Sequence, residues 1–338
     1  MRLARYHHTA VRLCAAPVLF PRGTRVAGAA PTATIFAGVI RGRYAPSPTG
    51  ELHLGNLRTA VLAWLFAHRD DSDGDRGELL YRIEDLDASR VRPGVAEAQR
   101  RDLESLGLDF DPPLVVQSER FAAYRAALKA LADRSYPCFC TRREIAEAAS
   151  APHAVAGRYP GTCRGLTAAE RAERARTRTP ALRLRAAPDE VTISDLLHGD
   201  VSGRPDDIVL RRNDGVAAYN LAVVVDDADS EVNQVVRGDD LLESAISQAY
   251  LTQLLGRRVP IYAHVPLALN SDGRRLAKRD GAVTLSDLAA GGVGPDRVLT
   301  RIAASLGLAG PDEPVSLRLL LERFDAAALP RPPWIVDG

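Results

Sequence analysis

Apolar and polar positions form blocks along this chain that are typical of an α/β protein. An apolar run over 36–40 opens a strand from Ala37 that leads into a turn, and a helical pattern follows over 57–69. A polar segment at 70–77 separates this helix from a second apolar run over 79–83. A strand, a helix and a strand in this order predict a βαβ unit with parallel strands.

The second half of the chain has the same character. We predict a short strand over 208–211, and we interpret the almost wholly apolar run 217–227 as a central, buried strand. A strand that ends at Arg237 then leads into a helix over 241–255. Further helices are predicted over 93–106, 121–135, 168–176, 295–306 and 317–328, and a further strand over 181–185. Strands and helices that alternate in this way indicate an α/β fold with a parallel sheet.

Composition narrows the class of protein. The chain has 338 residues, is 46% hydrophobic and 26% charged, and carries a net charge of +1, so it can bury a large core and has no overall charge that would attract nucleic acid. Seven arginines against two glutamates between Arg164 and Arg185 form a local basic stretch. This stretch fits a solvated helix face and a polyanion-binding patch equally well.

No apolar run approaches the roughly 20 residues that span a bilayer, so we expect no membrane segment. Four cysteines, three of them clustered, give no disulfide framework, and we expect a reducing cytoplasm. Residues 1–36 contain several arginines and no acidic residue. That composition is similar to an organellar transit peptide, but we interpret the segment as a disordered tail or a start codon assigned too far upstream.

The stretch RYAPSPTGELHLGN, residues 43–56, is the centre of the candidate chemistry. Its prolines and glycine fix a turn, and His53 and Gly55 fall where the first free N–H groups of a helix can hold phosphate. A lone His-x-Gly would fit an ordinary surface turn. Glu84, with Asp85 and Asp87, follows the second strand, where open α/β sheets bind their ligands.

Three cysteines lie close together in the sequence, after the predicted βαβ unit. Cys138 and Cys140 are too close in sequence to bridge each other comfortably, but with Cys163 they could share a metal such as Zn²⁺. A zinc site needs a fourth ligand, and His153 is the nearest candidate by residue type. The alternative is three unrelated buried thiols.

The stretch 43–56 resembles the R-x-A-P-S-P-T-G-x-L-H-x-G opening of class I aminoacyl-tRNA synthetases of the glutamyl and glutaminyl branch, with Asn56 where the fuller signature has a second histidine. SDGRRLAKRDGAVTL, 271–285, resembles their K-M-S-K-S loop, with Arg275 and Ala277 replacing its first lysine and its serine. Lys278 matches the catalytic lysine. The resemblance implies a Rossmann-like parallel sheet that binds ATP with Mg²⁺ through His53, Gly55 and Lys278. The glutamate-binding residues that it implies are Arg43, Ala45, Ser47, Glu84, Tyr219 and Arg237.

Only 60 residues follow Lys278, too few for the anticodon-binding domain of complete glutamyl or glutaminyl synthetases. In this the chain resembles the small glutamyl-queuosine synthetases, whose C-x-C and Y-x-x-x-C pattern implies zinc on Cys138, Cys140, Tyr159 and Cys163. Tyr159 reproduces that spacing, so we rank it above His153. The layout so implied is a tail over 1–36, two halves of a nucleotide-binding fold over 37–135 and 201–285, a zinc-binding insertion over 136–200 and a short helical segment over 286–338.

The resemblance implies that a monomer activates L-glutamate with ATP and transfers it to queuosine in the anticodon of tRNA(Asp). Three alternatives stay open. A glutamyl-tRNA synthetase fragment would charge tRNA(Glu), and a small-molecule ligase would pass glutamyl-adenylate to an amine. A non-catalytic RNA-binding module would have little reason to keep His53, Glu84, Arg237 and Lys278 together.

Overall fold

A three-stranded parallel sheet opens the chain in the computed structural model, which describes residues 39–69, 76–149, 158–276 and 283–336. Its strand order is β1 (Arg41–Tyr44), β2 (Glu78–Ile83) and β3 (Asp111–Val116). Helix α1 (Leu54–His68) connects β1 to β2, so the predicted βαβ unit is confirmed. The structure gives β1 from Arg41, and Ala37, where we predicted the strand to begin, lies outside the described residues.

A second sheet has the order β7-β6-β10-β9. β10 (Ile261–Val265) lies parallel to both β9 (Gln234–Gly238) and β6 (Val191–Asp195), and β7 (Gly199–Gly203) pairs antiparallel with β6. Asn233, just before β9, joins the two sheets. Its backbone N–H donates to the Arg41 carbonyl (3.0 Å), and its side-chain oxygen accepts from the Arg41 N–H (2.8 Å). The parallel strands of the two sheets therefore meet at β1 and β9.

The predicted strand over 217–227 is wrong, because these residues form helix α6 (Tyr219–Asp229). Its residues from Leu221 to Asp227, two aspartates among them, are all buried, so the helix is enclosed on nearly every side and its sequence shows no clear helical period. Three consecutive valines added a strand preference. A short, continuous apolar run does not distinguish a buried helix from a buried strand.

No helix was predicted at Arg142–Ala149 or Leu285–Ala290, and the remaining helices begin close to their predicted ranges. Those that surround the sheets are α2 (Val95–Ser105), α3 (Phe121–Ala130), α7 (Leu242–Leu254), α8 (Leu285–Ala290), α9 (Pro295–Ser305) and α10 (Leu317–Arg323). The last helix ends at Arg323, earlier than predicted, because Phe324 is extended and packs edge-on against Phe66 of α1. β11 (Ala268–Leu269) and β12 (Trp334–Ile335) form a short parallel pair, and Ala268 and Trp334 pack in the same hydrophobic core as α1. In the described ranges, no helix is both long and apolar enough to cross a membrane.

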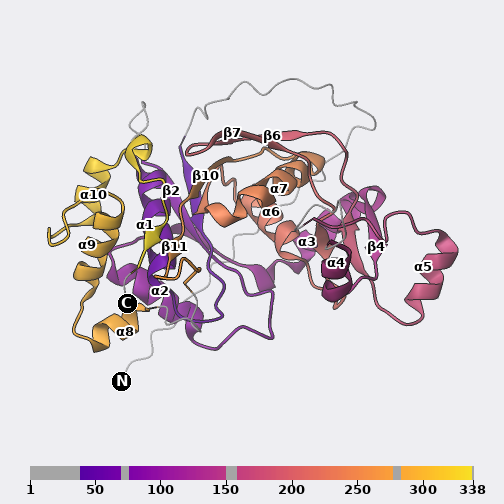
Figure 1. The fold of residues 1–338 in the computed structure, drawn as a ribbon, viewed down its shortest axis with the longest axis horizontal. Helices are drawn as coiled ribbons and strands as arrows, with labels where there is room; N and C mark the ends of the chain where they lie inside the picture. The colour runs from indigo at the N-terminus through magenta and orange to yellow at the C-terminus, as the bar shows by residue number, and fades with distance from the viewer. Residues whose placement is uncertain (1–38, 70–75, 150–157, 277–282, 337–338) are drawn as a thin grey trace. The chain divides into compact units, whose positions relative to one another are not determined.

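A small antiparallel sheet lies beside the three clustered cysteines, of which Cys138 is the last residue of its first strand. Its order is β4 (Ser135–Cys138), β5 (Ala181–Leu184) and β8 (Val209–Arg211). The helix predicted to reach 135 ends at Ala130, and one 3₁₀ turn leads from it to β4. Helices α4 (Arg142–Ala149) and α5 (Ala168–Ala175) lie between β4 and β5 in the sequence, and Figure 1 draws α4 next to β4.

Candidate active site and thiol cluster

His53 is the N-cap of α1. Its Nδ1 accepts from the Asn56 N–H (3.3 Å), and the Asn56 side-chain oxygen accepts from the His53 N–H (3.2 Å), so Asn56 completes a capping box. Because Nδ1 is an acceptor, the ring proton is on Nε2, which is free to donate to a phosphate oxygen. Burial, with a contribution from the Arg275 charge, lowers the pKa of His53 to about 4. The ring is therefore neutral at pH 7.

Gly55 leaves space at the same helix start. A Cβ there would lie 3.1 Å from the His53 ring and 3.1 Å from the Ala268 methyl group, so a larger residue would crowd the histidine. The chain that follows the segment 277–282, which carries Lys278, lies beside this point at Val283. Lys278 itself and Ala277 lie outside the described residues, but the Val283 carbonyl beyond the loop accepts from the Leu54 N–H (3.2 Å).

Asp227 of α6 holds two buried arginines from neighbouring strands. Its carboxylate accepts from Arg43 Nε of β1 (3.2 Å) and from Arg82 Nη1 of β2. Arg82 also donates to the Glu84 carboxylate (3.2 Å), just beyond the end of β2. Burial raises the pKa of Glu84, and the charges of Arg82 and Arg43 oppose that rise only in part. A bound cation would favour the ionised form of this carboxylate.

Arg237 of β9 is 6% exposed, and its partners are of a different kind. Its guanidinium donates to His264 Nε2 (3.1 Å), to the Gln248 side-chain oxygen (2.7 Å) and to the Leu241 carbonyl (3.3 Å). Each of these acceptors is uncharged, and Arg237 forms no ion pair within the part of the chain that the structure describes. A buried charge without an ionic partner is unfavourable until an anion binds.

Tyr219, the first residue of α6, faces the same space. Tyr219 is 42% exposed, and partial desolvation where it lines the cleft raises the pKa of its phenol. The Glu84 charge raises this pKa further, whereas the charges of Arg237 and Arg43 lower it. Tyr219, Ser47 and Glu84 line one cleft of about 1050 Å³, which continues to Cys138, Cys140, Arg142 and Arg212 beside the small sheet. Ala45 lies in the turn directly after β1. The predicted glutamate-binding residues are thus distributed around the carboxyl ends of β1, β2 and β9.

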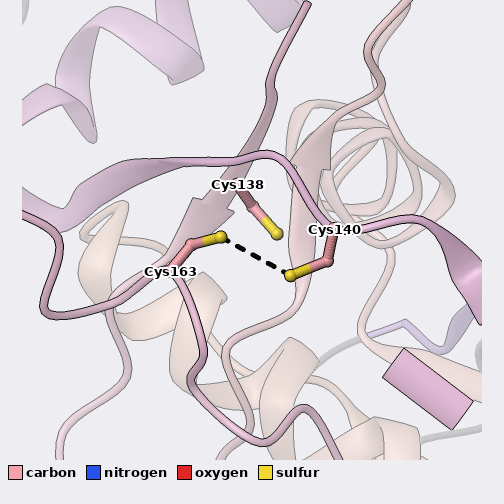
Figure 2. Close-up of side chains that lie close together, drawn as sticks. All are labelled: Cys138, Cys140 and Cys163. Carbon is pink, nitrogen blue, oxygen red and sulfur yellow. Dashed lines mark hydrogen bonds between the residues drawn. The ribbon is translucent and has the colours of Figure 1, made fainter. Parts of the chain in front are cut away.

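The cysteine cluster brings the four predicted zinc ligands together. The sulfurs of Cys138, Cys140 and Cys163 all lie within 4.8 Å of one another, and those of Cys140 and Cys163 are 3.5 Å apart (Figure 2). The Tyr159 hydroxyl is 3.3 Å from the Cys138 sulfur and 3.5 Å from the Cys140 sulfur. Three sulfurs and one oxygen around a common centre suit tetrahedral zinc, in which ligand sulfurs are roughly 3.8 Å apart. The alternative ligand, His153, lies outside the described residues.

Two arginines adjoin these sulfurs. Arg183 Nε donates to the Cys138 sulfur (3.3 Å), and its guanidinium lies over the Tyr159 ring, 3.8 Å from the ring centroid. Arg174 of α5 donates to the Cys163 sulfur (3.8 Å). Arg183 is buried against the cluster, whereas Arg174 is exposed and reaches it with one guanidinium nitrogen. The positive charge of both would balance thiolates.

Comparison with known families agrees with this geometry. Residues 39–312 match the sequence model of the catalytic domain of the class I tRNA synthetases (E and Q). The chain belongs to this family. The predicted α/β synthetase fold and the predicted ligase class are thereby confirmed.

Two named proteins and one solved structure are similar to this synthetase over most of its chain. A protein of Nocardia farcinica named glutamyl-Q tRNA(Asp) synthetase is 59% identical over 87% of this chain and 92% of its own length. A protein of Cutibacterium acnes with the same name is 52% identical over 82% of this chain and 78% of its own. A crystal structure of a glutamate tRNA ligase from Elizabethkingia meningosepticum, in complex with its amino acid, has a TM-score of 0.72 at 28% identity, covering 88% of this chain and 67% of the other.

The structure adds four residues of the synthetase that sequence reasoning did not assign to the site. Arg82 stands two residues before Glu84, and Asp227 is the last residue of the apolar run 217–227, so a signal for both existed. His264 and its partner Asp195 had no signal, because β10 and β6 were not predicted as strands.

Proposed function

We propose that this protein activates L-glutamate with ATP as glutamyl-adenylate and transfers the glutamyl group to queuosine in the anticodon of tRNA(Asp). The observation that carries the amino-acid part is Arg237. A buried guanidinium with only neutral partners calls for an anion, and the side-chain carboxylate of glutamate supplies one. Glu84, which lines the same cleft as Tyr219, would hold the α-ammonium group.

Activation would take place at the start of α1. An oxygen of the glutamate α-carboxylate attacks the α-phosphate of ATP, the bond to the bridging oxygen breaks, and pyrophosphate leaves with the electron pair. His53 would donate from Nε2 to a phosphate oxygen, Gly55 would let the nucleotide approach the backbone, and Lys278 would stabilise the charge that grows on the leaving pyrophosphate. Mg²⁺ bound with ATP would neutralise further phosphate charge.

The acceptor would enter along the cleft. Its walls run from Ser47 and Tyr219 to Arg142 and Arg212, so positively charged side chains flank the path by which RNA would reach a bound adenylate. Zinc on Cys138, Cys140, Tyr159 and Cys163 would fix the end of β4 against the segment at 159–163, which is a structural role. The names of the Nocardia and Cutibacterium relatives support queuosine of tRNA(Asp) as the acceptor.

One observation favours a second candidate. The solved relative from Elizabethkingia is a glutamate tRNA ligase, and its likeness covers 88% of this chain. A synthetase with the same glutamate and ATP sites would instead charge the terminal ribose of tRNA(Glu).

Transfer of labelled glutamate tests the proposal. The purified protein is given ATP, labelled glutamate and one of three tRNAs: queuosine-bearing tRNA(Asp), the same tRNA without the modification, and tRNA(Glu). We expect label on the queuosine-bearing tRNA alone. Label on tRNA(Glu) would establish the second candidate, and glutamate-dependent pyrophosphate exchange with three unlabelled tRNAs would leave a small-molecule acceptor.

A further inference from the structure

Three residues from three adjacent strands form a buried hydrogen-bonded triad that includes Arg237 of the candidate glutamate site. Arg237 of β9 donates from Nε to His264 Nε2 of β10 (3.1 Å), and His264 Nδ1 lies 2.6 Å from Asp195 Oδ2 of β6. His264 is fully buried and Asp195 is 5% exposed. Because arginine only donates, His264 Nε2 must be the unprotonated nitrogen, and the ring proton must be on Nδ1, where it donates to Asp195.

Asp195 is fixed in place for this role. Besides the histidine ring, its carboxylate accepts from the backbone N–H groups of Leu197 (2.8 Å), His198 (3.0 Å) and His264 (3.1 Å). Burial would raise the pKa of Asp195, but the hydrogen bonds from His264 and from these backbone groups lower it below its ordinary value. The carboxylate therefore stays ionised and selects one histidine tautomer.

A second orienting contact acts on the same guanidinium. The Gln248 side-chain nitrogen donates to the Asn220 side-chain oxygen (2.9 Å), which turns the Gln248 oxygen toward Arg237. Arginine has five N–H groups, and the contacts to His264, Gln248 and Leu241 use three of them. Two N–H groups remain among the described contacts, the number that a carboxylate takes in a bidentate pair.

We propose that His264 is a positioning residue for recognition of the substrate's side-chain carboxylate: as a neutral acceptor oriented by Asp195, it fixes the plane of the Arg237 guanidinium without cancelling its charge. A carboxylate in the place of His264 would hold the arginine equally well, but it would form an internal ion pair and weaken the attraction for an acidic amino acid. This inference rests on the proposed use of glutamate. It explains how the Arg237 guanidinium is held in one orientation while its positive charge stays unpaired and can attract a carboxylate.

The surroundings keep His264 neutral. Burial lowers its pKa first; the Asp195 hydrogen bond raises it, and the charges of Arg237 and His198 lower it again. On its own strand, Tyr262 stacks against the ring with 5.5 Å between the centroids. A protonated His264 would present a donor to a donor at Arg237 and lose the contact.

Two substitutions of His264 separate the two hydrogen bonds of the triad, the one to Asp195 and the one to Arg237. In His264→Asn, the amide nitrogen can replace Nδ1 and keep the bond to Asp195, but nothing reaches Arg237. In His264→Gln, the longer amide can place its oxygen where Nε2 was and keep the bond to Arg237, while the bond to Asp195 is lost. Asp195→Asn, of nearly the same shape, should turn the histidine proton to Nε2, where it opposes Arg237.

The readouts are glutamate KM and kcat in ATP–pyrophosphate exchange, and glutamate affinity by calorimetry without ATP. Since a hydrogen bond to a charged group contributes about 1.5–3 kcal/mol, we expect His264→Asn and Asp195→Asn to raise glutamate KM and Kd roughly ten- to a hundredfold with kcat within about threefold. His264→Gln should stay within about threefold of the wild type. Thr252→Val is the control, because it removes another buried hydrogen bond, to the Gln248 carbonyl (2.8 Å), without touching Arg237.

The pattern of results decides the inference. Equal effects of His264→Asn and His264→Gln on glutamate KM, or an unchanged KM in Asp195→Asn, would overturn it while leaving the proposed function intact. If His264→Asn does not fold, the comparison of Asp195→Asn with His264→Gln carries the test alone. A wild-type protein that binds no glutamate would overturn the proposed function and this inference together.

Discussion

Asp227→Asn should destabilise the fold strongly, because one carboxylate holds two buried guanidinium groups. Arg43 is 6% exposed and Arg82 is 2% exposed, and Asp227 accepts from both. Loss of its charge leaves Arg43 with the Val236 carbonyl (3.4 Å) and a weaker amide contact, and leaves Arg82 with Glu84. Removing one partner of a buried ion pair typically costs about 3–5 kcal/mol. Since asparagine keeps one acceptor oxygen, we expect a loss of about 3 kcal/mol in the free energy of unfolding.

Urea denaturation at 25 °C, followed by circular dichroism, measures that loss. Asp229→Asn is the matched control, because Asp229 lies two residues further along α6 and pairs with Arg120 and Arg257 at a surface where its side chain is 31% exposed. Such exposed pairs contribute about 1 kcal/mol or less. If the two variants lose equal amounts, or if Asp227→Asn loses less than about 1 kcal/mol, the buried-pair reasoning is wrong.

The pH dependence gives an independent check on the same carboxylate. Burial would raise the pKa of Asp227, but the charges of Arg43 and Arg82 lower it below its ordinary value in the folded protein. A group with a depressed folded pKa contributes its stability above the unfolded pKa, which is about 3.9, and loses it as the pH falls through the folded value. The stability difference between wild type and Asp227→Asn should therefore be constant from pH 7 to about 5 and shrink below about 4.

Three further predictions concern chemistry. Arg237→Gln should lower kcat/KM for glutamate at least tenfold relative to glutamine in pyrophosphate exchange; an unchanged preference would mean that Arg237 does not contact the substrate side chain. Lys278→Ala should lower the rate of adenylate formation by orders of magnitude with a modest change in ATP affinity, whereas Lys129→Ala, at the only other lysine of the chain, should have no effect. Elemental analysis should find about one zinc per chain, lost in Cys163→Ser and kept in Cys14→Ser; a folded, metal-free wild type would contradict the zinc site.

The first half of the site was predictable because its signals are local. The strand, turn and helix of residues 43–68 are consecutive, and Glu84 directly follows a strand with a clear apolar pattern. Proline, glycine and an N-cap histidine determine such a turn within a few residues. The thiol cluster was predictable for a related reason, since the sequence spacing of Cys138, Cys140 and Cys163 already limits how they can meet.

The second half of the site was less predictable, because elements that are buried on all sides lack the alternation of apolar and polar residues that identifies a helix or a strand. Helix α6 has no polar face that would reveal its period, so its residues were taken for a strand. Strands β6 and β10 were not predicted at all, although they complete the second sheet. Without them the sequence gives no reason to connect His264 with Arg237, because that contact exists only through the order of the strands.

The two kinds of buried arginine in this site follow from where the fold puts its carboxylates. Asp227 points from α6 to Arg43 and Arg82, whose charges are neutralised within the protein, so both can serve as rigid structure. Asp195 is one strand further away and reaches Arg237 only through His264. The neutral imidazole of His264 fixes the orientation of the Arg237 guanidinium without neutralising its charge. The buried guanidinium groups at β1 and β2 therefore pair with a carboxylate of the protein, whereas the one at β9 has only neutral partners among the described residues.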